Sequence, residues 1–187
     1  MTNRPNLRRK LLVGRICVVF AFLACSNLDN IIITKSANTT IQGGSPLSIL
    51  DELGFVEFGS IDVSNEQEFK NRGFDIDDVD SVKVDSLTLE IISPASGQDF
   101  EFIDSIAFYA VGENGRRELI AEGGPFQAGL RTVGLDVTDV NLKDYAKAGS
   151  FSLGTEVDGN SPQNTTTIKA TVALNVDVAI GHLICGK

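Results

Sequence analysis

The clearest pattern in the chain is an alternation of apolar and polar residues near its C-terminus. From Ile168 to Ile180 every second residue is apolar, and most of the residues between them are polar. A strand with one buried face has this period of two, because its side chains point alternately to opposite sides of the sheet. Related apolar patterns recur along the chain, so we predict seven strands, at residues 56–63, 82–92, 102–111, 116–121, 131–138, 150–158 and 166–180.

Two local features refine these strands. Asn114-Gly115 predicts a tight hairpin between the third and fourth predicted strands, because both residues tolerate positive φ. Within the second predicted strand the apolar alternation slips by one residue. Since such a slip turns the apolar side chains to the other face, we predict a β-bulge near Asp85 and Ser86.

Capping patterns predict three short helices, the second opened by Ser64 and the third by Asn141. These helices span residues 46–53, 65–72 and 142–148. Seven short strands joined by turns and small helical crossings predict an all-β fold, an antiparallel β-sandwich of the immunoglobulin-like type.

The N-terminal residues have the composition of an export signal. Five basic residues and no acid precede Ile16, and the nine residues from Ile16 to Ala24 are all apolar. This run suits a secretory signal and is too short to span a bilayer. We therefore predict a signal peptide over 1–24, a Ser-, Asn- and Thr-rich tether over 25–44, and a folded domain over 45–187, although residues 31–34 could instead pair as an edge strand.

Cys25 decides where the exported protein resides. Residues 22–25, "FLAC", resemble the lipobox of bacterial lipoproteins, in which the cysteine becomes the lipidated first residue of the mature chain. Cleavage after Ser26 is the alternative, and it would release a secreted or periplasmic protein. A Cys25 that is retained unmodified could instead form a disulfide with Cys185. We expect a lipoprotein of the bacterial cell envelope, anchored to the outer membrane through Cys25.

Charge narrows the possible partners. Removal of the five basic residues of the leader changes the formal net charge from −9 to −14. Such an acidic protein repels the phosphate backbone, so we expect no nucleic-acid partner. The expected partners are the membrane, through the lipid anchor, and another envelope protein or a polysaccharide.

The densest acidic cluster, at residues 75–80, is the first place to look for a metal site. Asp75, Asp77 and Asp80 could contribute oxygen ligands to calcium, but the surrounding residues depart from an EF-hand loop. We therefore assign no metal and no cofactor, and interpret the cluster as a solvated acidic turn. His182 and Cys185 lie near the C-terminus without a third group that would complete a catalytic or metal site, so no catalytic residue is predicted.

Several segments together resemble a group of small, functionally uncharacterised bacterial envelope lipoproteins. The segments are "VKVDSLTLEIISP", "FEFIDSIAFYAV" and "LDVTDVNLKDYAKAGSFSL", followed by a long Thr-rich last strand. A looser likeness is to the water-stress sandwich domains of late-embryogenesis proteins. The first resemblance implies a lipid-anchored β-sandwich without an activity. We therefore expect a non-enzymatic interaction protein, with a calcium-dependent adhesion module as the alternative and a carboxylate-based hydrolase third.

Overall fold

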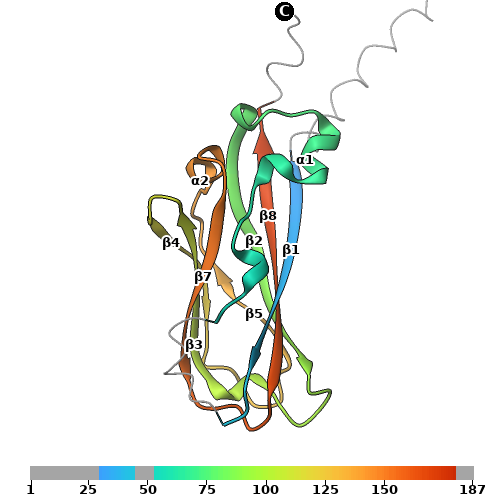
Figure 1. The fold of residues 1–187 in the computed structure, drawn as a ribbon, viewed down its shortest axis with the longest axis vertical. Helices are drawn as coiled ribbons and strands as arrows, with labels where there is room; N and C mark the ends of the chain where they lie inside the picture. Colours follow the sequence, from blue (N-terminus) through green and yellow to red (C-terminus); the bar gives the residue numbers. More distant parts are fainter. Residues whose placement is uncertain (1–29, 45–52, 180–187) are drawn as a thin grey trace, which may run out of the picture.

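The protein is a sandwich of two antiparallel sheets of four strands each (Figure 1). The computed structural model describes residues 30–44 and 53–179. The first sheet has the order β1-β8-β2-β5 and the second has the order β6-β4-β3-β7. The strands are β1 (Asn30–Ile41), β2 (Val79–Ser93), β3 (Ile103–Gly112), β4 (Arg117–Gly123), β5 (Thr132–Gly134), β6 (Asp136–Val137), β7 (Phe151–Gly159) and β8 (Thr166–Val178). The predicted all-β sandwich is confirmed.

Short helical turns connect the strands. They are η2 (Val56–Phe58), η3 (Val63–Asn65), α1 (Gln67–Arg72), η4 (Ile76–Asp78), η5 (Phe100–Phe102) and α2 (Lys143–Lys147). Within the described ranges, no helix is long and apolar enough to cross a bilayer. The helix predicted at 46–53 falls almost entirely outside the described residues.

The tether prediction is wrong for residues 30–41, because they form β1. This strand pairs with β8 along its whole length, from Asn30 opposite Asp177 to Ile41 opposite Thr166. Its buried side chains are Ile31, Ile33, Ala37 and Ile41. The Ser, Asn and Thr residues that suggested a linker lie mostly on the exposed face of the strand, so composition concealed a period of two.

The strand predicted at 56–63 is also wrong. The chain forms η2 and η3 there, and only Ile61 makes an isolated bridge, to Phe151 of β7. Phe55, Phe58 and Ile61 are buried and recur every third residue, a spacing that suits 3-10 turns better than a strand. This segment closes the side of the sandwich between β1 and β7 (Figure 1).

The strand predicted at 131–138 is divided between the two sheets. Val133 of β5 pairs with Leu89 of β2, whereas Val137 of β6 pairs with Ala121 of β4. Leu135, between the two short strands, is buried in the core. The chain therefore crosses from one sheet to the other at Leu135.

The predicted bulge and hairpin are confirmed, with one difference in the turn. The register of β2 against β8 shifts between Val84 and Ser86, at the predicted position. In the β3–β4 hairpin only Gly115 has positive φ, at 76°, and its N–H donates to the carbonyl of Gly112 at 2.9 Å. The turn is therefore of the three-residue kind that ends in a left-handed glycine.

The two predicted helices within the described residues are present, but a different residue caps the start of the first. Asp62, rather than Ser64, caps the turn before α1, since its carboxylate accepts the N–H groups of Ser64 and Asn65. Asn141 does contact the start of α2, where its side-chain oxygen accepts the N–H of Lys143 at 3.0 Å. The same oxygen accepts the N–H of Val82 at 3.1 Å, so it also joins α2 to β2.

Phenylalanine fills much of the single core between the sheets. Among the described residues, five of these rings are fully buried, at Phe58, Phe69, Phe100, Phe108 and Phe151. Thr155 is a buried polar residue. Its hydroxyl accepts a hydrogen bond from the N–H of Leu53 and donates one to the carbonyl of the same residue, each at 2.8 Å. These bonds satisfy polar backbone groups where the chain passes beside β7.

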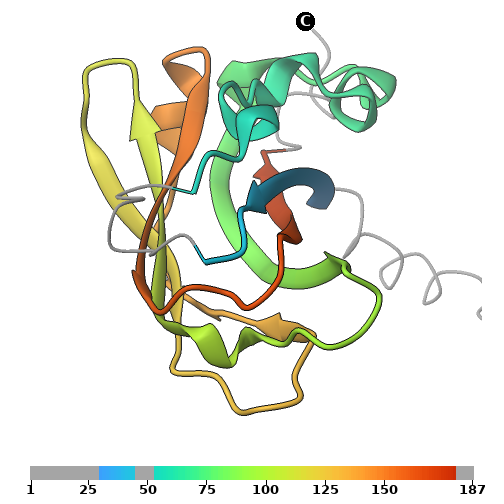
Figure 2. The ribbon, with the colours of Figure 1, turned by 60° about the horizontal axis from the view of Figure 1, so that its bottom comes forward.

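Four loops gather at one end of the sandwich, here called the four-loop end (Figure 2). They comprise residues 42–44, 94–99, 124–131 and 160–165. The guanidinium of Arg131 donates to the carbonyls of Ile91, Pro94 and Gln98 at 2.6 to 2.8 Å. Gly44 donates to the carbonyl of Pro162 at 3.0 Å, so the loops are fastened to one another.

Candidate functional site

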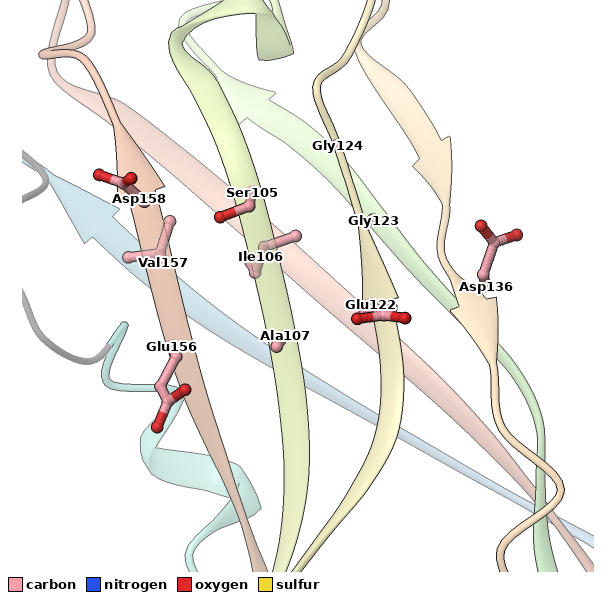
Figure 3. A pocket seen from close by; sticks show the side chains of 10 residues that line it. All are labelled: Ser105, Ile106, Ala107, Glu122, Gly123, Gly124, Asp136, Glu156, Val157 and Asp158. Atoms are coloured by element: carbon pink, nitrogen blue, oxygen red, sulfur yellow. The ribbon is translucent and has the colours of Figure 1, made fainter.

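A hollow lies on the exposed face of the second sheet (Figure 3). Its volume is about 510 Å³, within the range of sites that accept small ligands or single side chains of a partner. It is lined by Ser105, Ile106, Ala107, Glu122, Gly123, Gly124, Asp136, Glu156, Val157 and Asp158. Strands β3, β4, β6 and β7 all contribute, so the sheet itself forms the floor.

Strand register places the acidic side chains of the hollow around a floor of small residues. Ala107 of β3 lies opposite Glu122 of β4 on one side and opposite Glu156 of β7 on the other. Glu122 in turn lies opposite Asp136 of β6. Because neighbouring strands are about 4.8 Å apart, this row of four residues spans about 14 Å. Alanine in the row leaves space that a larger side chain would fill.

One wall of the hollow is a network centred on Glu156. Its two carboxylate oxygens accept hydrogen bonds from Tyr109 Oη at 2.9 Å and from an Arg117 guanidinium nitrogen at 2.8 Å. The Arg117 guanidinium also lies 4.2 Å from the centre of the Tyr109 ring, a cation–π contact. The hydrogen bond from Tyr109, followed by the one from Arg117, lowers the pKa of Glu156. The same bond to Glu156 raises the pKa of Tyr109.

The other carboxylates of the hollow are exposed and unneutralised. Glu122 and Asp136 form no ion pair and accept no hydrogen bond within the part of the chain that the structure describes. Asp158 accepts only its neighbour's N–H, that of Gly159, at 2.9 Å. A concave surface lined by charges of one sign concentrates the field and attracts counter-ions. The chemistry that suits this hollow is recognition of a positively charged group.

The acidic cluster singled out from the sequence is used for local capping. The Asp75 carboxylate accepts the N–H of Asp77 at 3.1 Å, and Asp78 accepts the N–H of Asp75 at 3.0 Å, which makes a capping box for η4. Asp80 lies 3.6 Å from the Lys143 ammonium. Within the described ranges, no group of three or more acidic, histidine or cysteine side chains could hold a metal.

The remaining candidates lie outside the described residues. Cys25, His182 and Cys185 belong to segments about which the structure gives no account. Lipid attachment at Cys25 and the alternative disulfide therefore stay predictions.

Sequence reasoning missed the hollow because its residues come from separate strands. Glu156 and Asp158 are two residues apart on a predicted strand, which places them on one face. Nothing in their spacing indicates that Glu122 and Asp136 join them. The signal in the sequence that points to the hollow is the polar side of the alternation, which places Glu156 and Asp158 on the exposed face of their strand.

A second, smaller hollow of about 240 Å³ lies between the β3–β4 hairpin and α2. Arg116 and Tyr145 line it, with the guanidinium 5.4 Å from the centre of the ring. Arg116 also pairs with Glu118 at 2.7 Å, so its charge is already neutralised within the protein. The larger hollow is therefore the stronger candidate for ligand binding.

Comparison with known proteins adds no assignment to this geometry, since no family model matches the chain and no curated protein sequence is significantly similar to it.

Proposed function

We propose that the protein is a non-enzymatic lipoprotein of the bacterial cell envelope whose sandwich binds a positively charged partner. Cys25 would carry the lipid, and the acidic hollow of the second sheet would contact the partner. The observation that supports the binding role is the convergence of Glu122, Asp136, Glu156 and Asp158 on one hollow of about 510 Å³.

Binding fits this hollow better than catalysis does. A carboxylate hydrolase of the glycosidase kind needs one carboxyl group with a raised pKa, so that it can donate a proton near neutral pH. The pKa of Glu156 is lowered, which keeps this group an anion. The hollow therefore has the features of a recognition surface.

The geometry also suggests which cations fit. Arg117 demonstrates how a guanidinium is held on this face, between the Tyr109 ring and the Glu156 carboxylate. The carboxylates of Glu122 and Asp136 could pair with a partner's arginine or lysine in the same way as Glu156 pairs with Arg117. Because the acidic row crosses four strands, a short basic peptide laid across the sheet could engage more than one carboxylate at once.

Neutralising the hollow is expected to weaken binding of an oligoarginine peptide. We expect the double variant Glu122→Gln and Asp136→Asn to bind this peptide about fivefold more weakly, since each exposed charge pair contributes about 0.5 kcal/mol. Isothermal titration calorimetry at low salt, with the purified protein in detergent, measures the change. The affinity of the unmodified protein should also fall as salt is added.

A matched control separates the hollow from net charge. Asp85→Asn combined with Glu90→Gln removes the same charge from exposed positions on the first sheet. Equal weakening in both double variants would show that the peptide responds to total charge, and the hollow would lose its assigned role.

The anchor has a separate test. In cells fed a clickable palmitate analogue, the unmodified protein should incorporate the label and fractionate with membranes. The Cys25→Ala variant should lose both properties, because no other cysteine follows a lipobox-like segment. Labelling that persists in Cys25→Ala would rule out this attachment site.

A further inference from the structure

The two ends of the sandwich lie at different distances from Cys25. β1 begins at Asn30, which pairs with Asp177 near the end of β8. The N–H of Ala179 donates to the carbonyl of Asp78 in η4 at 2.8 Å. The start of β1, the end of β8 and η4 therefore lie together beside α1, at what we call the α1–η4 end (Figure 1). The four-loop end lies at the opposite end of the strands (Figures 1 and 2).

Covalent reach limits how far Cys25 can be from this end. Five peptide steps separate Cys25 from Asn30, and an extended chain covers at most about 3.6 Å per step, or about 18 Å in all. β1 has twelve residues, so its first and last Cα atoms are separated by eleven steps of about 3.3 Å, or about 36 Å. A lipid on Cys25 can therefore hold the α1–η4 end at the membrane surface. If the four-loop end faced the membrane instead, Cys25 would be too far from the lipid surface for its lipid to insert.

Charge opposes a second arrangement, in which the domain lies on the face of its second sheet. That face carries the hollow with Glu122, Asp136, Glu156 and Asp158. Anionic headgroups attract basic segments and repel acidic ones, and the effect acts within about a Debye length of the surface. The α1–η4 end also holds the acidic cluster at 75–80, but Lys143 lies 3.6 Å from Asp80 and Lys147 donates to the carbonyl of Asp77, so part of that charge is offset. The unneutralised face of the second sheet is repelled more strongly and is therefore turned toward solvent.

The hollow is also nearer to the four-loop end than to the α1–η4 end. Two residues that line it, Ser105 and Asp158, lie opposite each other. Ser105 is two positions from the start of β3, and Asp158 is one position from the end of β7. Both of these strand ends lead into the four-loop end (Figure 2). Reach, charge and position thus give one consistent orientation.

We infer that the anchored protein stands with its α1–η4 end against the lipid headgroups, and that the hollow and the four-loop end are directed away from the membrane. This inference rests on the proposed function, because it takes the anchor at Cys25 from it. It adds a restriction on the partner. The cationic segment that enters the hollow approaches it from the side that faces away from the lipid surface.

Fluorescence quenching from the headgroup layer tests this orientation. The lipidated full-length product is placed in vesicles of phosphatidylethanolamine and phosphatidylglycerol that carry a headgroup quencher. A fluorophore is attached at Asn71→Cys in α1 or at Ala95→Cys in the 94–99 loop, two exposed positions at opposite ends. Cys185→Ser is included throughout, so that one free thiol reacts. A second pair, Asp77→Cys and Ala128→Cys, repeats the comparison at other exposed positions.

The label at Asn71→Cys is expected to lose most of its emission, and the label at Ala95→Cys is expected to lose little. Equal quenching at both ends, or stronger quenching at Ala95→Cys, overturns the orientation and leaves the anchor intact. Failure of the protein to bind the vesicles, together with palmitate labelling that does not depend on Cys25, overturns the anchor and the orientation with it. Retained peptide binding in that case leaves the role of the hollow standing.

Discussion

Replacing Phe108 by alanine is expected to destabilise the protein by about 4 kcal/mol. Phe108 is fully buried in β3, the strand that also forms the floor of the hollow, and its ring centre lies 5.7 Å from that of Phe55. The substitution removes this contact and leaves a cavity that the two rigid sheets cannot close. Urea unfolding, followed by circular dichroism in the β region, measures the loss as a lower transition midpoint.

Val56→Ala is the control for this substitution. Val56 is 84% exposed in η2, so shortening its side chain should change the free energy of unfolding by less than about 0.5 kcal/mol. If Phe108→Ala were as mild as Val56→Ala, the packing described for the core around β3 would be wrong.

Gly159→Ala is expected to cost about 3 kcal/mol of stability, because the substitution forces a new carbon into occupied space. A Cβ at Gly159 would lie 2.3 Å from the carbonyl oxygen of Phe102 and 2.9 Å from the backbone nitrogen of Asp104. Both neighbours are backbone atoms at the start of β3, so neither can swing away as a flexible side chain would. The free energy of unfolding from urea titration again measures the effect.

Gly97→Ala separates crowding from backbone conformation. Gly97 has positive φ, at 78°, as Gly159 does, at 151°, but no atom lies within 4 Å of the position that the Cβ at Gly97 would take. It should therefore cost only about 1 kcal/mol, the penalty of a left-handed conformation for alanine. Equal losses in the two variants would contradict the close approach of β7 to β3.

Phe108→Ala and Gly159→Ala should also affect the hollow. β3 lies between β4 and β7, and its exposed residues Ser105 and Ala107 form part of the floor. The position of the surrounding carboxylates depends on how tightly β4 and β7 are held against β3. Loss of packing beneath this strand, or of close contact at its start, should therefore weaken oligoarginine binding in addition to lowering stability.

The sequence by itself determined the features that depend on near neighbours in the chain. Alternation over residues 168–178 identified a strand with one buried face, because the pleat sends successive side chains to opposite sides. The slip near Asp85 and the turn at Gly115 were predicted for the same kind of reason, since bulges and tight turns need particular residues locally. Together these signals were enough for the class of fold.

Local patterns failed where distant contacts decide the conformation. Residues 30–41 have the composition of a linker, yet they form a strand because β8 offers its whole edge for hydrogen bonding. Residues 55–61 are as apolar as a strand, yet they form turns because they must close the gap between two sheet edges. In both segments the partner, and not the residues' own preference, determines the backbone.

Only the tertiary structure decided the hollow. The register of β4 against β3 shifts between the pairs Phe108–Ala121 and Tyr109–Leu119, so that Ile120 is an extra residue in β4. This shift allows Ile120 and Ala121 to be buried next to each other while Glu122 remains exposed opposite Ala107. Asp136 joins the row because the chain changes sheets at Leu135. Since register and sheet exchange are set by pairing between strands far apart in the chain, no spacing within the sequence could bring these carboxylates together.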